Sequence, residues 1–272
     1  MIQKYVIALD LDGTLTNHNK EITPRTYKAL MEAEKQGAVI VLASGRPTYG
    51  IEPLAQCLKL DEKGGFILSY NGGKIVDCKT NKVLYTKSLP KEVLPIIYDY
   101  ATTHNYALLG YLGDEILTEK PDDEYVKEES RINKMAICRV ENLLAALEDT
   151  PTKLLLTGCP EDMVKAESEL FGLLQTKMDV FRSAPFFVEL VPKGIDKAQS
   201  LERLLQHLGL NATNLIAFGD GYNDMSMIKY ANIGVAMANA APELRAIADY
   251  VTLSNEEDGV GVFLENFYKE IE

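Results

Sequence analysis

Two aspartates end an apolar run near the start of the chain. Asp10 and Asp12 close the segment ALDLDGTLT, residues 8–16. Like charges this close repel, and each loses hydration when it is enclosed, so the pair costs free energy unless a cation or a proton lies between them. Residues i and i+2 of an extended segment point to the same side, so both carboxylates are expected to face one centre. The pair therefore predicts a bound partner at this position.

Polar residues also follow two other apolar runs. In an open α/β sheet, ligands bind at the carboxyl ends of the strands, so these segments are expected to meet Asp10 and Asp12 in one crevice. Carboxylate oxygens suit Mg²⁺ better than a soft metal, which predicts a magnesium site with some carboxylates left free to react. The additional residues are Ser44, Gly45 and Arg46 after AVIVLA, Asp220 at the end of NLIAFGD, and Asn223 and Asp224 just beyond it.

Each of these segments also has a simpler structural interpretation. A lone DxDGT is more often a turn than a catalytic motif, and ASGR is compatible with a plain strand-to-helix turn as well as with an anion cradle. An EF-hand is excluded because Leu15 stands where glycine is required, and GDGYND lacks the third glycine of a dinucleotide fingerprint. The combination of DLDGT with GDGYND favours catalysis, because isolated acidic turns do not predict one another.

A lysine late in the chain is expected to complete this site. Lys197 opens the amphipathic segment DKAQSLERLLQHLG, and Lys193 lies shortly before it. A cation there could bridge a nucleophilic carboxylate and a bound phosphoryl group. Lys197 is the preferred candidate and Lys193 the alternative.

The elements that would position these residues alternate in type at both ends of the chain. KYVIAL, AVIVLAS and FILSY are continuous apolar runs typical of covered parallel strands. The middle of the chain instead contains strands that follow one another without a helix, and its helix KEVLPIIYDYATTH is expected to be interrupted by Pro95. We therefore expect an α/β fold with a Rossmann-like, doubly wound parallel-sheet core (1–84 and 189–272) and an inserted, antiparallel α+β domain (85–188).

The composition is acidic, with a net charge of −12 over 272 residues. This charge disfavours nucleic acid and anionic membranes as partners, and an anionic substrate would need a local positive potential at the site. No apolar run has the length of a membrane span and no signal peptide is recognisable, so we expect a cytoplasmic protein. The scattered cysteines and histidines indicate neither a redox pair nor a Ser-His-Asp hydrolase.

The segments DLDGT, ASGR, GIDKAQSL and GDGYNDMSM occur in the order and spacing of the haloacid-dehalogenase-like (HAD) phosphohydrolases, which the chain resembles over nearly its whole length. The inserted domain, with SYNGG and SAPFFVELVPKG, resembles the cap of the Cof-type sugar phosphatases, type IIB. The resemblance implies that Asp10 is the nucleophile that forms an aspartyl-phosphate and that Asp12 is the general acid and base. The expected phosphate site comprises Leu11, Ser44, Gly45, Lys197 and Asn223, and the expected Mg²⁺ site comprises Asp10, Asp12 through its carbonyl oxygen, Asp220 and, through water, Asp224.

The resemblance further implies a Mg²⁺-dependent phosphatase of small phosphorylated metabolites, with sugar phosphates favoured and the cap recognising the leaving group. A phosphosugar mutase of the same branch is an alternative. A non-hydrolytic phospho-acceptor signalling protein is another, although the extra middle domain argues against it. We expect a monomer or a small homo-oligomer. The candidates for substrate contact are Arg46, Asn71, Arg182, Ser183 and Glu189, and a purely structural role is an open alternative for those in the cap.

Overall fold

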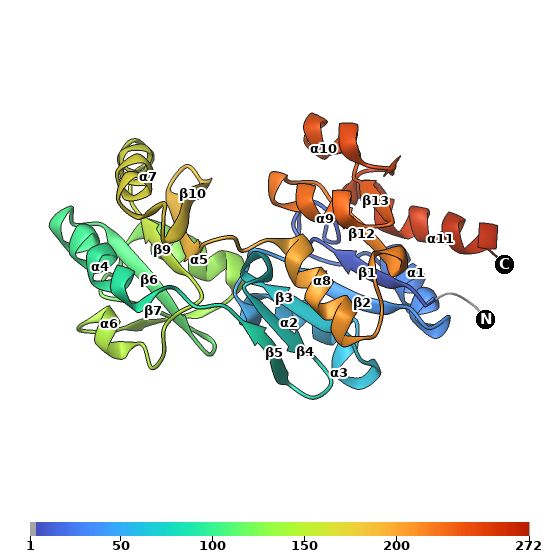
Figure 1. Ribbon diagram of the computed structural model, residues 1–272, viewed down its shortest axis with the longest axis horizontal. Coiled ribbons are helices and arrows are strands. Elements are labelled where there is room, and N and C mark those ends of the chain that lie inside the picture. Colours follow the sequence, from blue (N-terminus) through green and yellow to red (C-terminus); the bar gives the residue numbers. More distant parts are fainter. Residues whose placement is uncertain (1–3, 272) are drawn as a thin grey trace. The chain divides into compact units, whose positions relative to one another are not determined.

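The protein, described by a computed structural model over residues 4–271, divides into two compact units (Figure 1). The first unit comprises residues 1–85 and 196–272, and the second comprises residues 86–195. The second boundary lies at 195/196 rather than at the expected 188/189. The reason is that strand β11 (Phe187–Pro192) continues its pairing with β10 (Met178–Ala184) across the expected boundary.

The first unit is built on one eight-stranded sheet. The strands lie in the order β14-β13-β12-β1-β2-β3-β4-β5; neighbours from β14 to β3 are parallel, and β4 runs antiparallel to β3. The chain order reverses between β1 and β12, which makes this the switch point where open α/β sheets bind ligands. The strands are β1 (Val6–Leu9), β2 (Val39–Ala43), β3 (Phe66–Ser69), β4 (Lys74–Asp77), β5 (Lys82–Thr86), β12 (Leu215–Gly219), β13 (Ile233–Ala236) and β14 (Tyr250–Val251).

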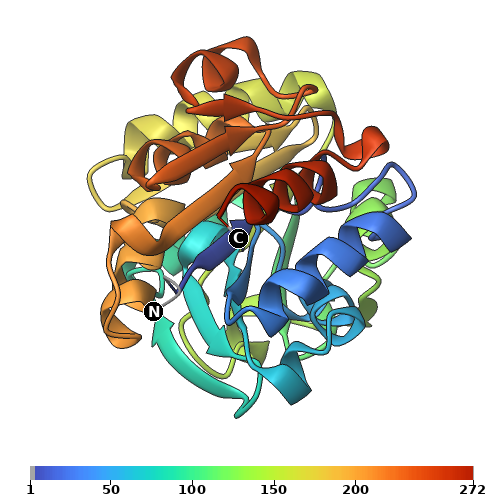
Figure 2. The same cartoon turned by 90° about the vertical axis from the view of Figure 1, so that its right-hand side faces the viewer.

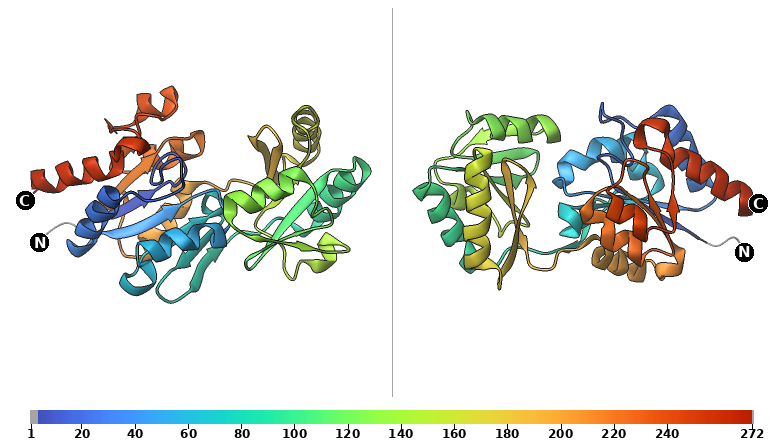
Figure 3. Two further views of the ribbon diagram at one scale, coloured as in Figure 1. Left: turned by 180° about the vertical axis from the view of Figure 1, so that it is seen from behind. Right: turned by 90° about the horizontal axis from the view of Figure 1, so that it is seen from above.

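Helices cover both faces of this sheet. They are α1 (Pro24–Lys35), α2 (Thr48–Cys57), α3 (Leu60–Lys63), α8 (Lys197–His207), α9 (Met225–Tyr230), α10 (Pro242–Ile247) and α11 (Gly259–Ile271). In Figure 2, α8 (orange) and α1 (blue) lie on opposite sides of the strands. Helix α8 packs beside α9, and α1 packs beside α11, which comes to the front in the left view of Figure 3. All four β1 residues are fully buried between these layers, which explains the uniformly apolar strand and gives the expected doubly wound core.

The start of α8 is fixed by two contacts. The Gln199 N–H donates to Asp196 Oδ1 at 3.0 Å, so Asp196 caps the helix and Lys197 is its first residue. One turn later, Ser200 Oγ donates to the Gly72 carbonyl oxygen at 2.6 Å. Gly72 has a φ of +96°, and a Cβ there would meet Ser200 Oγ at 2.6 Å, so this approach requires glycine. These contacts fix where α8 starts and so the position of Lys197 in the chain of contacts around the sheet edge.

The second unit is an α+β domain with a six-stranded sheet in the order β10-β11-β9-β6-β7-β8. Its pairs are antiparallel except β7 with β8, which is parallel. The sequence predicted only antiparallel pairs here, but α5 supplies the crossover that a parallel pair needs. The remaining elements are β6 (Ala107–Leu112), β7 (Glu115–Thr118), β8 (Ala136–Arg139), β9 (Leu154–Thr157), α4 (Leu94–Thr103), α5 (Glu124–Asn133), α6 (Leu143–Ala146) and α7 (Pro160–Leu174).

The expected interruption of a helix at Pro95 is wrong. A short 3-10 helix, Lys91–Val93, precedes α4, and Pro95 lies in the first turn of α4. Proline is tolerated there because first-turn N–H groups have no partner within the helix. The helix therefore runs from Leu94 to Thr103 without a break. Among the helices of the described residues, none has the length and apolar character needed to cross a membrane.

Candidate active site

The carboxyl ends of β1 and β12 bring two predicted aspartates together at the switch point of the sheet. Leu9 is paired with Phe218, and the Asp10 N–H donates to the Phe218 carbonyl oxygen at 3.0 Å. Asp220 follows the last residue of β12 directly. Both carboxylates therefore lie where the topology predicts a ligand.

One buried cation lies between Asp10 and a third aspartate. Lys197 Nζ donates to Asp10 Oδ1 at 2.7 Å and to Asp224 Oδ1 at 2.6 Å. Asp224 ends the 3-10 turn Tyr222–Asp224, directly before α9. Lys197 is 1% exposed, Asp10 6% and Asp224 0%, so all three charges are almost completely removed from water. Such a group is costly to disrupt, because removing one partner leaves an uncompensated buried charge.

The charges of this cluster do not balance. Burial would lower the pKa of Lys197, but the charges of Asp10 and Asp224 outweigh it and raise that pKa, so the ammonium stays protonated. Burial and the neighbouring charge of Asp224 raise the pKa of Asp10, and Lys197 offsets only part of the rise. One lysine shared by two carboxylates leaves an excess of negative charge, which a further cation would relieve.

Asp220 is held by the loop that follows β1. Thr14 Oγ1 donates to Asp220 Oδ1 at 2.7 Å, and a Cβ at Gly13, whose φ is +88°, would lie 2.3 Å from Asp220 Oδ2. Asp224 Oδ2 accepts the N–H groups of Asp220 and Gly221 at 3.0 and 2.9 Å. Burial raises the pKa of Asp220 to about 6, although the hydrogen bond from Thr14 acts against the rise. The carboxylate of Asp220 is thus fixed in direct contact with the backbone of this loop.

The donor set of the cluster fits a hard cation. Carboxylate oxygens of Asp10, Asp220 and Asp224 lie within 4.8 Å of one another, and oxygen ligands are those that Mg²⁺ prefers. Both Asp224 oxygens already accept hydrogen bonds, whereas Lys197 occupies only one oxygen of Asp10 and Thr14 only one of Asp220. Such an ion would therefore be held by Asp10 and Asp220, with Asp224 supporting the cluster indirectly.

The carboxylate of Asp12 has different partners, because β1 ends at Leu9 and the chain turns instead of staying extended. Arg46 binds it twice, from Nε to Oδ2 at 2.8 Å and from Nη2 to Oδ1 at 2.6 Å, and Lys20 Nζ donates to Oδ1 at 2.6 Å. Burial alone would raise the pKa of Asp12, but the hydrogen bonds and charges of Arg46 and Lys20 hold it below its ordinary value. Among the hydrogen bonds of the described residues, the side chains of Asp10 and Asp12 have no partner in common, and a shared ligand for the two carboxylates stays a prediction.

The loop after β3, which contains Asn71, contacts Ser44 and Gly45, the residues that follow β2. The Asn71 N–H donates to the Ser44 carbonyl oxygen at 2.9 Å, and Asn71 Oδ1 accepts from Asn223 Nδ2 at 3.0 Å. A Cβ on Gly45 would lie 3.1 Å from the Asn71 side chain. Ser44 is buried, and its Oγ accepts the Arg46 N–H at 3.2 Å. The structure therefore connects these predicted phosphate and substrate residues to one another.

The predicted substrate residues of the second unit make ion pairs there. Arg182 Nε lies 2.6 Å from Glu167 Oε2. Glu189 lies 2.8 Å from Lys153 Nζ in a buried pair, and Glu189 also accepts a hydrogen bond from Ser183 Oγ at 2.8 Å. Each of the three predicted residues thus has a partner within the second unit, as a structural role would require. A role of these residues in substrate binding stays a prediction.

Two further predicted residues are limited in what they can contribute. Leu11 is fully buried, so only its backbone is suited to a polar ligand. Lys193 belongs to the second unit, where its ammonium donates to the Gln175 carbonyl oxygen. Of the two lysines, it is Lys197 that contacts the aspartates.

Three residues of this site were not singled out from the sequence: Gly13, Thr14 and Lys20. Gly13 and Thr14 stand in the motif DLDGT, and a glycine directly after a reactive carboxylate is a signal for close backbone approach. Lys20 carries no such signal, because its contact with Asp12 depends on how residues 17–21 fold back.

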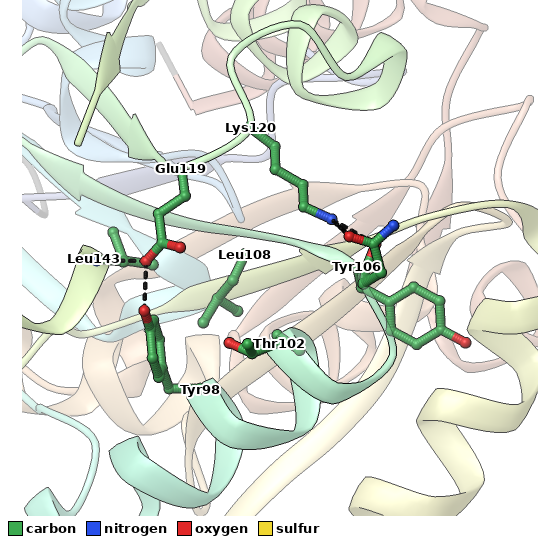
Figure 4. A pocket seen from close by; sticks show the side chains of 9 residues that line it. Tyr98, Thr102, Tyr106, Leu108, Glu119, Lys120 and Leu143 are labelled. Carbon is green, nitrogen blue, oxygen red and sulfur yellow. Dashed lines mark hydrogen bonds between the residues drawn. The ribbon is translucent and has the colours of Figure 1, made fainter. Parts of the chain in front are cut away.

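The second unit also contains a cavity of about 240 Å³ that includes none of the predicted site residues (Figure 4). Tyr98 Oη donates to Glu119 Oε1 at 2.7 Å, and the same oxygen accepts the Leu143 N–H at 3.0 Å. On the other side, Lys120 Nζ donates to Asn105 Oδ1 at 2.6 Å. Several polar groups of the wall therefore partner one another.

Known proteins resemble the chain over nearly its whole length. The family model of haloacid dehalogenase-like hydrolases matches residues 7–264. A crystal structure of such a hydrolase from Bacteroides thetaiotaomicron superposes with a TM-score of 0.95 at 49% identity, covering 97% of this chain and 100% of that one. The 5-amino-6-(5-phospho-D-ribitylamino)uracil phosphatase YitU of Bacillus subtilis is 30% identical over 97% of each chain. BT4131, described as a HAD subclass IIB sugar phosphatase, superposes with a TM-score of 0.81 at 25% identity, covering 97% and 98% of the two chains.

Replacing Gly13 tests how tightly the loop after β1 holds Asp220. Gly13→Ala should lower the free energy of unfolding by about 2–4 kcal/mol, because left-handed backbone strain adds to a clash with the Asp220 carboxylate. Gly37→Ala is the matched control, since Gly37 has a φ of +95° and open space around it. It should cost about 1–2 kcal/mol. Urea denaturation measures both losses, and equal losses would contradict the close contact.

Proposed function

The chain belongs to the haloacid dehalogenase-like hydrolases, in the Cof-type branch with a type IIB cap, and we propose that it is a Mg²⁺-dependent phosphatase of small phosphorylated metabolites, foremost sugar phosphates. Two of the relatives named above, YitU and BT4131, are named as phosphatases, so the reaction class, hydrolysis of phosphoric monoesters, follows from the family. The proposal adds the metal, the covalent intermediate and the substrate class, together with a cytoplasmic monomer or small homo-oligomer.

The buried group of Asp10, Asp224 and Lys197 supports this proposal most directly. Three charges almost free of water are a poor choice for fold stability, because burying them costs more than a well-packed apolar cluster would. The arrangement suits phosphoryl transfer, since a carboxylate and an ammonium lie side by side at the ligand-binding edge of the sheet. It is the observation on which the proposal depends.

Asp10 is the proposed nucleophile. An Asp10 oxygen attacks phosphorus, the bond from phosphorus to the ester oxygen breaks, and an aspartyl-phosphate forms. Lys197 stays beside Asp10 and stabilises the negative charge that builds on the phosphoryl oxygens. Ser44 and Asn223 are proposed to donate hydrogen bonds to those oxygens, and Mg²⁺, when bound, offsets further charge on them.

Asp12 is the proposed acid and base of the two steps. It gives a proton to the leaving alkoxide in the first step, then takes one from the water that attacks the aspartyl-phosphate. Its carboxylate is more exposed than that of Asp10 and is oriented by two hydrogen bonds from Arg46. This setting keeps the carboxylate in one orientation and within reach of substrate and water.

The names of two relatives support a polyhydroxylated leaving group. The Bacillus relative is named for a phosphorylated ribityl compound, and BT4131 is described as a sugar phosphatase. A sugar or sugar-alcohol phosphate is therefore the proposed substrate class. Transfer of the phosphoryl group to another hydroxyl, as in a mutase, would instead give an isomerised sugar phosphate without free phosphate.

Asp10→Asn and Asp12→Asn should each lower the rate of phosphate release by at least about a thousandfold, because one removes the nucleophile and the other the proton transfer. The measurement is inorganic phosphate released from a panel of sugar phosphates with Mg²⁺. Asp122→Asn, at a side chain that is 93% exposed, is the control for the loss of a carboxylate. Near-normal release by Asp10→Asn would show that the nucleophile is another residue.

Lys197→Met should lower kcat by about a hundredfold to a thousandfold, the range for loss of one charge-stabilising donor. Lys193→Met is the matched variant, because it removes the same charge from a lysine whose ammonium binds a carbonyl of the second unit. It should keep near-normal activity. Circular dichroism and urea denaturation would separate loss of chemistry from loss of fold, and a larger effect of Lys193→Met would reverse the assignment.

Affinity for Mg²⁺ should fall as the pH is lowered. Burial raises the pKa of Asp220 to about 6, and the pKa of Asp10 is also raised, so protons compete with the cation for both carboxylates. Below about pH 6, each proton that Mg²⁺ must displace from one of these carboxylates lowers the affinity for Mg²⁺ by up to about tenfold per pH unit. Titration calorimetry at pH 5, 6.5 and 8 measures this trend, and a pH-independent affinity would exclude these two ligands.

A further inference from the structure

The single negative charge of the Asp12 carboxylate is paired with two cations, Arg46 and Lys20. Arg46 alone forms a complete bidentate pair with it, and the Arg46 side chain is fixed further by a hydrogen bond from Nη1 to the Gly50 carbonyl oxygen at 3.3 Å. Lys20 adds a second cation to the same carboxylate at 2.6 Å. The charge of Lys20 is therefore in excess at this point of the site.

The two cations differ in how free they are to bind something else. The Arg46 side chain is 10% exposed, whereas that of Lys20 is 47% exposed. An ammonium has three N–H donors, and among the described residues Lys20 donates one of them, to Asp12. Lys20 thus has two donors and an open side from which a ligand can approach.

The backbone holds Lys20 in this place independently of Asp12. Lys20 has a φ of 63°, a costly conformation for a residue other than glycine, and its N–H donates to the Asn17 carbonyl oxygen at 2.9 Å. Asn17 Oδ1 also accepts the N–H groups of Asn19 and Glu21, each at 3.0 Å. The loop therefore presents Lys20 to Asp12 by its own hydrogen bonds.

A second anchor ties the same loop to the core. The backbone N–H of His18 donates to Glu256 Oε1 and its ring Nδ1 lies next to Glu256 Oε2, both at 2.7 Å. Asn255 Nδ2 donates to the Thr16 carbonyl oxygen at 2.9 Å. A loop with contacts on both sides is suited to hold one side chain ready for a ligand.

The position of Lys20 points to one part of the substrate. Lys197 lies in the buried cluster with Asp10 and Asp224, where the phosphoryl group reacts in the proposed mechanism. Lys20 lies on Asp12, the group that exchanges a proton with the leaving oxygen in that mechanism. An atom within reach of both Asp12 and Lys20 therefore belongs to the leaving group.

We propose that Lys20 is a specificity residue that binds the hydroxyl groups of the leaving alcohol, so that polyhydroxylated phosphate esters are preferred over esters of apolar alcohols. This inference rests on the proposed phosphatase function. The ammonium donates to a hydroxyl oxygen next to the scissile ester while Arg46 keeps Asp12 oriented. It supplies a positive contact for the substrate in a chain whose net charge is −12.

The test compares two substrates of the full-length enzyme with Mg²⁺. Glucose 6-phosphate has a leaving group rich in hydroxyls, and the ring of p-nitrophenyl phosphate has none. Lys20→Met should raise KM about tenfold more for glucose 6-phosphate than for p-nitrophenyl phosphate, the cost of one hydrogen bond to a charged group, whereas any change in kcat that follows from the contact of Lys20 with Asp12 should be shared by the two substrates. Lys20→Arg should restore part of the affinity. Lys35→Met, at a lysine that is 66% exposed on α1, should change neither substrate.

Each other outcome has a distinct meaning. A fall in kcat for glucose 6-phosphate, with KM unchanged, would show that Lys20 acts through Asp12 and would overturn the inference. Equal changes in KM for the two substrates, or no change for either, would overturn it as well. So would a wild-type enzyme that releases phosphate from p-nitrophenyl phosphate but not from glucose 6-phosphate. If the wild-type enzyme released phosphate from neither substrate, the proposed function would fail, and this inference with it.

Discussion

The carboxyl edge of the core sheet depends on one buried ammonium shared by two carboxylates. Lys197 joins the end of β1 to the turn before α9, and without it Asp10 and Asp224 would face each other unscreened in a site almost free of water. One positive charge does not neutralise both. The fold therefore creates a place that favours a further cation, and Asp220 brings one more carboxylate to it.

Several neighbouring features serve to hold this cluster. Asp196 caps α8 and so determines that Lys197 is its first residue. The loop of Gly13 and Thr14 presses against Asp220, and Asp224 accepts two backbone N–H groups of its own turn. These are local interactions, each formed within a loop or a helix start. The parallel sheet only has to bring the loops together, which it does because the ends of parallel strands meet at one edge.

Much of the fold follows from the sequence because its signals are local. The buried strands are continuous apolar runs, and α1 begins at Thr23 and Pro24, as a cap and a first-turn proline predict. The parallel pair of β7 and β8 and the uninterrupted α4 could not be predicted in the same way. A pairing direction depends on a distant crossover, and the effect of Pro95 depends on which residue starts the helix.

The same distinction applies to the site. The residue types that meet could be predicted, because strand ends converge whatever the details of the loops. The partners of Asp12 could not, since extended geometry ends at Leu9 and the following residues turn toward Arg46. The contact of Lys20 depends on a loop that folds back through several hydrogen bonds, none of which leaves a pattern in the sequence.

Two identical side chains, separated by one residue, thus acquire opposite electrostatic settings. Burial and a neighbouring carboxylate raise the pKa of Asp10, whereas Arg46 and Lys20 lower that of Asp12. The two carboxylates therefore differ in their charged partners and in their access to water. Asp10, deprived of water and next to Lys197, is suited to covalent attack, because no hydration shell has to be removed first. Asp12, half-exposed and oriented by arginine, is suited to proton exchange, because water and leaving group can both reach it.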